Sequence, residues 1–536
     1  MKLNIEGIKD NIPWEKAGIK LPDFDIKAMI ERTVKDPKWV HFGSGNIFRA
    51  FLAPLQQDLL EQKAVDTGIT AVAGFDLEII DALYKPCDNL TLLVTLKSDG
   101  TTEKSVIASV AQALKADCSS PDFARLQGVF CNPCLQMASF TITEKTYSLT
   151  TPSGGIIPSA EEDFKNGPSA PVNYMGKVAA LMYSRYRAGA FPVSLVSMDN
   201  CSHNGDKLKD SILAFARKWH ENGFTDSGFI SYLEDPSRVG FPCTMIDKIT
   251  PQPDDSVKKM LAADGLEGAE GFLSSKGSLL APFVNAEETQ YLVIEDIFPN
   301  GRAPLEKAGV IFTNRETVDL VERMKVCTCL NPLHTALAIF GCLLGYTRIS
   351  EEMKNPDLVK LIKGIGYAEG LPAASDPGII SPEKFINEVI NIRLPNPFMP
   401  DAPQRIATDS SLKIPIRYGE TIKAYMAGAT LKTGDLKFIP LVLAAWLRYI
   451  LGIDDTGKSF TVSPDPNYES VFAQIKGISL GQKGPFHETL KPILSNPNYF
   501  AVDLYKAGLG EKVESFFAEL LSGPGAVAAV LKKYTG

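Results

Sequence analysis

The sequence predicts an α/β protein with two domains: a Rossmann-type N-terminal domain with a mostly parallel sheet, and a mostly α-helical C-terminal domain. Three observations predict this fold class. The chain has 536 residues, whereas a single hydrophobic core stops growing at roughly 250–300 residues. Short apolar runs alternate with longer helix-like stretches up to about residue 300. Helical periodicity dominates after about residue 315.

The first half of the chain has the pattern of repeated strand and helix units. Each apolar run is short, and the stretches between the runs are long enough for crossover helices, so we expect parallel βαβ units. We therefore predict a nucleotide-binding domain over residues 1–304, with residues 1–37 as an N-terminal arm before the first strand. The predicted strands are Trp39–Phe42, Thr70–Phe75, Leu92–Leu96, Pro192–Ser197 and Tyr291–Ile294.

The second half of the chain shows few convincing strands. Its apolar residues recur at the three- and four-residue spacing of amphipathic helices. We predict a mostly helical domain for substrate binding and catalysis over residues 305–536. The clearest predicted helices are Val318–Lys325, Thr335–Leu344, Pro382–Ile392 and Val513–Leu521.

Composition and charge exclude several classes of partner. The chain is 45% hydrophobic and 22% charged, as in globular proteins, and no apolar run approaches the ~18 residues of a membrane helix. The net charge of −8 gives no general attraction to nucleic acid or to anionic lipid. The charged opening decapeptide and nine scattered cysteines indicate a cytoplasmic protein with reduced thiols. We expect a small-molecule substrate, and a monomer or a small homo-oligomer.

The first candidate site follows the first predicted strand. Lys38–Phe42 leads through Gly43 and Gly45 into a helical pattern that is clear from Ala50 onward. This is the strand, turn and helix order of a dinucleotide site, in which glycines let the backbone approach a pyrophosphate. The third glycine of the usual motif is absent, with Phe48 in its place. An ordinary strand-to-helix turn is an equal alternative.

The second candidate is the acidic residue that follows the next strand. Asp76 comes directly after the run Thr70–Phe75. An acid there accepts hydrogen bonds from the adenosine ribose and favours NAD over NADP. Asp76 lies 31 residues after Gly45, longer than the usual spacing of about 20. A loop acid without this role is the alternative.

A lysine, asparagine and histidine cluster is the third candidate. Glu322 and Lys325 are three residues apart, as are Asn331 and His334, so each pair can share a helical face. Pro332 cannot donate a backbone hydrogen bond and predicts a kink. A buried lysine can act as a general base, and an amide can donate to a developing oxyanion. A surface Lys–Glu pair with a core histidine is the structural alternative.

Together these segments resemble the mannitol dehydrogenase family of long-chain polyol-specific dehydrogenases. The family's cofactor turn itself lacks the third glycine. The order and spacing of the matching segments carry the resemblance, which spans most of the chain. In this sequence Thr146 replaces a family glycine, and Lys248 stands where arginine is usual. The segments are His41–Arg49, Ser139–Tyr147, Ser197–Asn200 with Asn204-Gly205, Phe241–Pro251, and Val293–Asp296 with Arg302.

The resemblance implies a role for each matching residue. Lys325 corresponds to the general acid/base, Asn200 and Asn331 to the amides that polarise the reacting oxygen, His334 to a substrate-binding residue of the catalytic set, and Glu322 to a proton relay. A salt bridge beneath the site is the alternative for Asp247 and Arg405. The implied substrate-binding residues are Asp247 and Arg405, and Lys413 is a further candidate for binding a substrate carboxylate. The candidate cofactor-binding residues are Gly43, Gly45, Asn46, Phe48, Arg49, Asp76 and Thr141.

This sequence departs from the family pattern in its catalytic helix. The lysine and asparagine positions of the family differ by five, whereas Lys325 and Asn331 differ by six, and Pro332 replaces the usual glycine. We predict that a π-bulge or a kink between Val326 and Asn331 absorbs the extra residue. We also predict that the side chains of Lys325 and Asn331 still face one cavity.

The resemblance implies an NAD-dependent, zinc-independent dehydrogenase that interconverts a sugar ketone and its secondary alcohol. Cys131 and Cys134 form the only C-x-x-C, and the five histidines form no H-E-x-x-H, so we expect no metal. The altered catalytic helix favours a keto-hexuronate, fructuronate reduced to mannonate, with Arg405, Lys413 or Arg417 as the cation for its carboxylate. Mannitol 2-dehydrogenase and tagaturonate reductase activities are the alternatives. A non-catalytic sensor of NADH or sugar acid is the alternative from another class.

Overall fold

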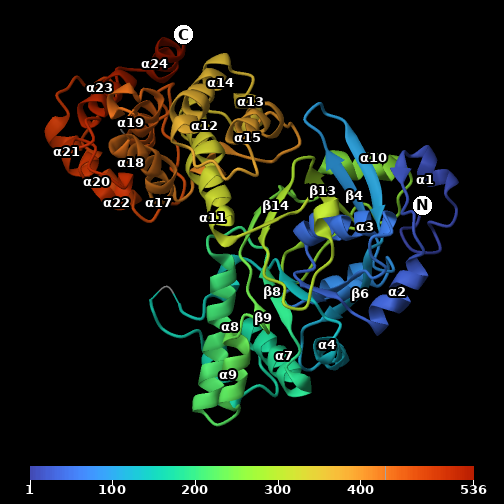
Figure 1. The fold of residues 1–536 in the computed structure, drawn as a ribbon. Helices are drawn as coiled ribbons and strands as arrows, with labels where there is room; N and C mark the ends of the chain where they lie inside the picture. Colours follow the sequence, from blue (N-terminus) through green and yellow to red (C-terminus); the bar gives the residue numbers. More distant parts are fainter. Residues whose placement is uncertain (152, 429) are drawn as a thin grey trace. The chain divides into compact units, whose positions relative to one another are not determined.

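The structure is a computed structural model that describes residues 1–151, 153–428 and 430–536. The chain forms two compact units. Unit 1 comprises Met1–Lys97 and Thr101–Asp319, and unit 2 comprises Ser98–Gly100 and Leu320–Gly536 (Figure 1). The predicted division between residues 304 and 305 falls inside unit 1. The strand β15 (Ile311–Thr313) pairs with β14 (Tyr291–Glu295) and extends this unit beyond the predicted boundary.

The main sheet of unit 1 has six strands in the order β6-β3-β2-β7-β8-β9. Every neighbouring pair is parallel. Counting β2 as the first strand, this is the order 3-2-1-4-5-6 of the dinucleotide-binding fold, in which ligands bind beyond the carboxyl ends of the strands where the order reverses. The strands are β2 (Trp39–Phe42), β3 (Ile69–Ala73), β6 (Val110–Lys115), β7 (Met137–Phe140), β8 (Val193–Ser197) and β9 (Val239–Gly240).

Helices connect these strands and cover the sheet. A π-helical turn, η1 (Phe48–Leu52), continues into α3 (Ala53–Glu61) and connects β2 to β3. On one face of the sheet, the buried core includes apolar side chains of α4, α7 and α8. Ser120 caps the first turn of α4 and Asn173 caps that of α7, which satisfies backbone N–H groups there. The three helices are α4 (Pro121–Cys131), α7 (Tyr174–Gly189) and α8 (Asn204–Glu221) (Figure 1).

The N-terminal segment is an integral part of unit 1 and not a separate arm. Its strand β1 (Ile19–Lys20) pairs with β5 (Thr102–Ile107), and its helix α2 (Ile26–Lys35) packs against β6. The N-terminal amine of Met1 donates a hydrogen bond to the carbonyl of Gly265. The prediction of an arm is therefore corrected, because the segment pairs and packs with elements of the same unit.

Two predicted strands belong to smaller sheets. The strand β4 (Thr91–Leu96) lies in the order β1-β5-β4-β13, in which β13 is Phe283–Glu287. It is antiparallel to β5, because the short connection 97–101 allows a hairpin but no crossover. In the third sheet, ordered β10-β14-β15, β14 is antiparallel to β10 (Thr244–Asp247). Both strands also have a parallel neighbour, β13 for β4 and β15 for β14. The prediction of parallel units is therefore corrected only for their antiparallel pairings with β5 and β10.

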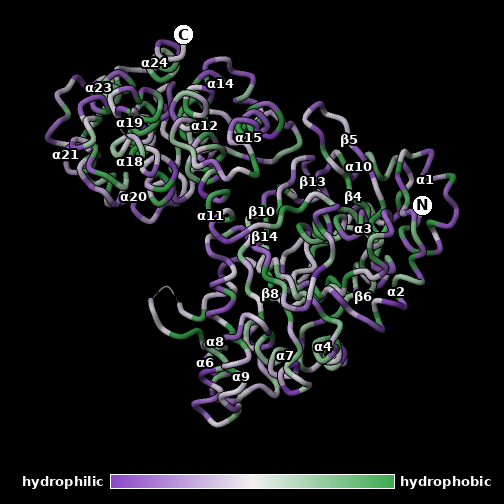
Figure 2. Tube along the Cα trace, in the orientation of Figure 1, coloured by the Kyte–Doolittle hydropathy of each residue, from purple (hydrophilic) through white to green (hydrophobic). Residues whose placement is uncertain are grey.

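Unit 2 consists mainly of helices, as predicted. Its centre contains α12 (Asn331–Leu344) and α19 (Phe438–Ile450), whose residues are mostly apolar and buried (Figure 2). The predicted helix Pro382–Ile392 is observed as α15 (Pro382–Glu388) followed by a π-helical turn. Further helices include α11 (Arg315–Arg323), α14 (Pro356–Lys363), α16 (Pro403–Ala407), α17 (Ser410–Ile414), α18 (Glu420–Ala427) and α23 (Gly510–Leu520). The predicted fold class is confirmed.

The segment 315–344 is long and apolar enough, by composition alone, to cross a membrane. Of its most apolar window, 83% is buried inside the protein, as in the core helix of a soluble protein.

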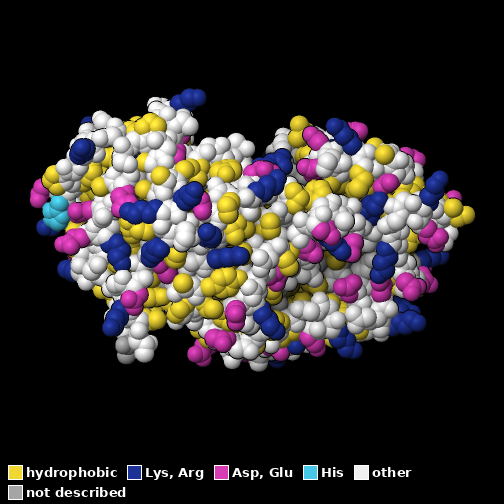
Figure 3. Space-filling model, turned by 90° about the horizontal axis from the view of Figure 1, so that it is seen from above, with side chains coloured by type: hydrophobic (Ala, Val, Ile, Leu, Met, Phe, Trp, Pro, Cys, Tyr) yellow, Lys and Arg dark blue, Asp and Glu magenta, His cyan; other side chains and the backbone are white. Residues whose placement is uncertain are grey.

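On the face drawn in Figure 3, Lys and Arg side chains are interspersed with Asp and Glu side chains. Charges of both signs are therefore mixed on that face.

Candidate active site

The turn after β2 has one glycine that the fold requires and one that leaves space for a ligand. Gly43 has φ +115°, and an added Cβ would lie 2.2 Å from the carbonyl oxygen of Thr141. A Cβ added at Gly45 would meet nothing within 4 Å. Gly43 therefore allows the turn to pack against the end of β7, and Gly45 leaves its surface open where a pyrophosphate would approach.

The helix after this turn begins at Asn46. The first backbone N–H groups of a helix have no partner within the helix, and together with the helix dipole they attract a phosphate group. The backbone N–H of Arg49 closes the first turn by donating to the carbonyl of Gly45 at 3.1 Å. Open space at Gly45 beside a helix N-terminus fits a dinucleotide cofactor.

Two predicted cofactor-binding side chains are buried among other residues of unit 1. The ring of Phe48 is fully buried and stacks on the ring of His41, with centroids 4.4 Å apart. The guanidinium of Arg49 is buried and donates to Thr91 Oγ1 at 3.0 Å and to the carbonyl of Ala281 at 2.8 Å. These side chains hold the helix inside unit 1, and that Phe48 and Arg49 bind the cofactor stays a prediction.

A chain of hydrogen bonds between β2 and β7 holds the cofactor turn in place. The indole of Trp39 donates to Ser139 Oγ at 2.7 Å, and Ser139 Oγ lies 2.7 Å from His41 Nδ1. His41 Nε2 lies 2.9 Å from Thr141 Oγ1, which donates to the carbonyl of Gly43. Burial lowers the pKa of His41 to about 3, which a backbone hydrogen bond with Gly43 partly offsets. The neutral imidazole thus connects the core of the sheet to the turn.

Thr141, predicted to bind the cofactor, is placed by this hydrogen-bond chain at the carboxyl end of β7.

Asp76 follows the carboxyl end of β3, the strand beside β2 in the sheet. Its Oδ2 accepts a hydrogen bond of 2.5 Å from Ser274 Oγ. Its Oδ1 is buried and has no hydrogen-bond partner, so this oxygen keeps its capacity to accept a ribose hydroxyl.

The carboxyl end of β8 positions Asn200. The preceding Asp199 accepts hydrogen bonds from the backbone N–H groups of Ile142 and Thr143, at 3.0 and 2.9 Å, and from the hydroxyl of Tyr147 at 2.6 Å. Burial raises the pKa of Asp199, and these hydrogen bonds oppose that rise. Asp199 therefore ties the loop after β7 to the loop after β8.

Asn200 itself is exposed at this strand end. Asn204, four residues later, is buried and donates to the carbonyl of Asp199 at 2.9 Å and to the carbonyl of Thr244 at 3.0 Å. Asn200 thus lies between two anchored residues. Asp247, at the end of β10, is buried and lies opposite Tyr291 in the antiparallel register.

In unit 2, Lys325 lies in a π-helical segment, η4 (Met324–Cys329). The backbone N–H of Leu330 donates to the carbonyl of Lys325 at 3.1 Å, across five residues. Leu330 then leaves the helical conformation with φ −120°, and α12 begins at Asn331 with Pro332 in its first turn. The predicted π-bulge is confirmed, because the wide turn accommodates the extra residue and Pro332 starts a new helix.

The catalytic candidates in this region differ in exposure. The side chain of Lys325 is buried, whereas Glu322, Asn331 and His334 are half-buried. Thr335 Oγ1 donates to the carbonyl of Asn331 at 2.9 Å and so tethers the first turn of α12. That Lys325 and Asn331 face one cavity stays a prediction.

His334 lies beside one acid and several cations. Its Nε2 is 3.5 Å from Asp401 Oδ2, and Asp401 also pairs with Arg405. Burial lowers the pKa of His334 to about 4, Asp401 opposes the shift, and the charges of Arg417, Arg405 and Arg393 add to it. His334 is therefore a neutral imidazole at neutral pH.

The predicted substrate cations have different partners. Lys413 Nζ donates to the carbonyls of Ile406 and Thr408, which end α16, and burial lowers its pKa. The half-buried Arg417 donates to Thr335 Oγ1, and among the described residues it pairs with no carboxylate. Burial lowers the pKa of Arg417 to about 10, so it is still charged at neutral pH.

Comparisons with known proteins agree with this arrangement. The Rossmann-domain model of mannitol dehydrogenase matches residues 37–307, and the model of the mannitol dehydrogenase C-terminal domain matches residues 317–520. A D-mannonate oxidoreductase of Thermotoga maritima is 53% identical over 100% of this chain and 99% of its own length. The chain belongs to the mannitol dehydrogenase family. The predictions of this family and of an oxidoreductase are confirmed.

Other members show the same similarity at lower identity. A mannitol 2-dehydrogenase of Pyrenophora tritici-repentis is 32% identical over 81% of this chain and 73% of its own. The solved structure of a D-sorbitol dehydrogenase in substrate-free form has a TM-score of 0.79 and 27% identity, covering 96% of this chain and 98% of its own. A Pseudomonas fluorescens mannitol 2-dehydrogenase, solved with NAD and D-mannitol, has a TM-score of 0.70 and 26% identity, covering 99% of both chains.

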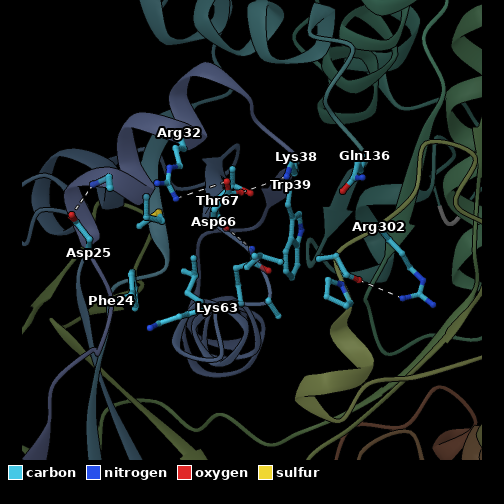
Figure 4. Close-up of a pocket in the computed structure, with 18 of the residues that line it drawn as sticks. Phe24, Asp25, Arg32, Lys38, Trp39, Lys63, Asp66, Thr67, Gln136 and Arg302 are labelled. Atoms are coloured by element: carbon cyan, nitrogen blue, oxygen red, sulfur yellow. Dashed lines mark hydrogen bonds and ion pairs between the residues drawn. The ribbon is translucent and has the colours of Figure 1, made fainter.

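A large cavity in unit 1 lies away from the cofactor turn of this family member. Its volume is about 720 Å³. Its lining includes Trp39 and Met137, the first residues of β2 and β7, whereas the cofactor turn follows the last residue of β2. Asp66 lies 3.9 Å from Arg32 and 3.6 Å from Lys38 at this cavity (Figure 4). The cavity is therefore at the opposite edge of the sheet from the predicted cofactor site.

Sequence reasoning missed His41, Ser139 and Asp401. The first two pair across parallel strands, a contact that no local pattern shows. Asp401 precedes Arg405 by four residues, a spacing that indicates a helical ion pair and was available in the sequence. Among the described residues, no group of three or more His, Cys, Asp or Glu side chains is arranged to hold a metal ion.

Proposed function

We propose that this family member is an NAD-dependent, metal-independent oxidoreductase that interconverts D-fructuronate and D-mannonate. Two relatives named D-mannonate oxidoreductase support this substrate, the Thermotoga maritima protein at 53% identity and an Escherichia coli protein at 29%. The burial of the apolar segment 315–344 supports a soluble enzyme.

Arg417 is the observation that carries the choice of a sugar acid. A half-buried guanidinium without a counter-ion is costly, and a ligand carboxylate would remove that cost. Arg417 pairs with no carboxylate among the described residues, and its charge acts on the imidazole of His334. A mannitol or fructose molecule has no anionic group for this cation, whereas fructuronate and mannonate have one.

The reaction follows from the roles of the side chains. NADH, held at the turn of Gly43 and Gly45, would supply the hydride for the ketone carbon when bound. Asn200 and Asn331 donate hydrogen bonds to the carbonyl oxygen, and the ammonium of Lys325 gives that oxygen its proton. The C=O double bond becomes a C–OH group, and Glu322 returns a proton from solvent to the neutral lysine. Oxidation of mannonate reverses each step.

The cofactor preference rests on Asp76. Its unpartnered Oδ1 supports binding of a ribose hydroxyl, and its negative charge opposes the 2′-phosphate of NADP. The family member solved with NAD supports the same choice. Gly43 and Gly45 supply the turn for the pyrophosphate.

The proposal is tested by measuring consumption of NADH and NADPH with fructuronate, tagaturonate and fructose. We expect the highest kcat/KM for fructuronate with NADH. Activity on fructose alone would assign mannitol 2-dehydrogenase activity instead. Lys325→Ala separates an enzyme from a sensor, because an enzyme loses turnover and keeps NADH binding. A wild-type chain that binds NADH and turns over none of the three substrates would contradict the proposal.

A further inference from the structure

A two-stranded hairpin of unit 1 contacts the acid that is proposed to read the cofactor ribose. Its strands are β11 (Phe272–Leu273) and β12 (Leu279–Leu280), which pair antiparallel. Ser274 follows β11, is buried, and donates through Oγ to Asp76 Oδ2 at 2.5 Å. In sequence the two residues are far apart, and the hairpin lies outside the six-stranded sheet. The contact therefore brings an additional element to the predicted cofactor site.

Ser274 couples the conformation of this turn to the orientation of Asp76. Its Oγ accepts the backbone N–H groups of Lys276 and Ser278, at 3.3 and 3.2 Å, while its proton goes to Asp76. The backbone N–H of Ser275 donates to Glu78 Oε2 at 2.9 Å. Two acids of the segment after β3 are thus held by one turn. Asp76 keeps one oxygen, Oδ1, buried and without a partner.

Two large apolar side chains flank this polar contact. Phe75 directly precedes Asp76 and is 73% exposed, and Leu273 directly precedes Ser274 and is 70% exposed. Because Asp76 and Ser274 are hydrogen-bonded, Phe75 and Leu273 occupy neighbouring backbone positions beside the carboxylate. Lys276 Nζ lies 5.8 Å from the centroid of the Phe75 ring. An exposed aromatic ring beside a ribose-binding acid fits a planar apolar group such as adenine.

We infer that the β11–β12 hairpin is part of the cofactor site: Ser274 positions Asp76 for the ribose hydroxyls, and Phe75 and Leu273 cover the adenine ring. This inference rests on the proposed function, since it assigns residues to the cofactor of that reaction. Ser274 is a positioning residue, because it acts on the cofactor through Asp76. Leu273 and Phe75 contact the adenine directly.

Direct NADH binding, measured by calorimetry on the full chain without substrate, tests the hairpin. Ser274→Ala removes the donor to Asp76, and we expect affinity for NADH to fall about 3- to 10-fold. Ser274→Thr keeps the hydroxyl and should retain near wild-type affinity. Leu273→Ala removes exposed apolar surface and should weaken NADH binding about 3- to 10-fold without a change in folding.

Matched controls come from similar contacts elsewhere in unit 1. Ser237→Ala removes a hydroxyl that donates to Asp235 Oδ1 at 2.7 Å on the surface, and Ile12→Ala shortens a side chain that is 71% exposed. Both should bind NADH like the wild type. Hydrogen–deuterium exchange supplies a second readout, in which NADH should slow exchange of the amides of Lys276 and Ser278.

The outcomes separate this inference from the proposed function. A wild-type chain that does not bind NADH contradicts the proposed function. Wild-type NADH binding, with unchanged affinity in both Ser274→Ala and Leu273→Ala and unchanged exchange in the hairpin, overturns the inference alone.

Discussion

The Nε2 atom of His334 lies 3.5 Å from Oδ2 of Asp401, and the same carboxylate pairs with Arg405. One buried acid thus contacts two residues that the family resemblance assigns to substrate binding. Asp401 opposes the effect of burial on the pKa of His334. This carboxylate therefore holds the imidazole and the guanidinium in one arrangement.

Asp401→Asn tests that arrangement. The amide cannot pair with both neighbours as an anion, so His334 and Arg405 lose their shared partner. We expect kcat/KM for the sugar acid to fall about 10- to 100-fold. Steady-state kinetics checks this, with Asp376→Asn as a control, because Asp376 accepts a local backbone N–H from Gly378. Equal kinetics in both variants would show that Asp401 has no role in the site.

Buried neutral imidazoles make the protein sensitive to acid. The pKa of His41 is lowered to about 3 and that of His334 to about 4, in both cases chiefly by burial, whereas the unfolded value is about 6.5. Between these values the unfolded chain binds more protons, so stability falls as pH drops below about 6.5. Each fully titrating imidazole changes the free energy of unfolding by about 1.4 kcal/mol per pH unit.

Urea unfolding of the wild type and of His41→Gln between pH 4 and 6.5 isolates this effect. Glutamine can bridge Ser139 and Thr141 but does not titrate. We expect the free energy of unfolding of the variant to depend less on pH, by roughly the contribution of one titrating proton. Identical slopes in the two proteins would mean that His41 does not remain neutral in the folded state.

The two glycines of the cofactor turn have separable effects. Gly43→Ala places a Cβ against Thr141 at positive φ, and we expect a loss of about 1–3 kcal/mol in unfolding free energy. Gly45→Ala meets open space, so the fold should be unchanged while NADH binding weakens severalfold. Thermal unfolding and calorimetry distinguish the two. Stable folding of Gly43→Ala, or normal NADH binding by Gly45→Ala, would contradict the described turn.

Lys325→Ala tests the acid/base role. Because general acid–base catalysis contributes about 10²- to 10⁴-fold, we expect kcat to fall by that factor. Single-turnover reduction and NADH titration on the same preparation measure the loss and show that the fold persists. Lys354→Ala, which removes an exposed lysine paired with Glu351, serves as the control. A Lys325→Ala protein with wild-type kcat would exclude the lysine as the proton donor.

Local signals predicted the fold class and the unusual catalytic helix. The apolar runs predicted β2, β3 and β8 of the parallel sheet, and Pro332 with the extra residue predicted the π-bulge that η4 shows. Gly43 follows β2 and Asp76 follows β3. They lie at the same edge of the sheet because the carboxyl ends of neighbouring parallel strands meet there. These features depend on residues close in sequence.

The rest depends on contacts between distant residues. Arg49 has the spacing of a cofactor-turn residue, yet its guanidinium is held by Thr91, which lies in another sheet, and by the carbonyl of Ala281. The boundary between the units depends on the pairing of β15 with β14. A strand as short as β15 has no clear sequence pattern, so this pairing could not be predicted. Asn200 belongs to unit 1 and Lys325 to unit 2, so their joint action stays a prediction.

The most direct test of the central claim compares fructuronate with fructose in the wild type and in Arg417→Ala. If Arg417 binds the substrate carboxylate, the variant should lose about 30- to 1,000-fold in kcat/KM for fructuronate and little of any activity on fructose. Circular dichroism and NADH affinity confirm that the variant is folded. A wild type that prefers fructose, or an Arg417→Ala variant that keeps its preference for fructuronate, would contradict the assignment of a sugar-acid substrate.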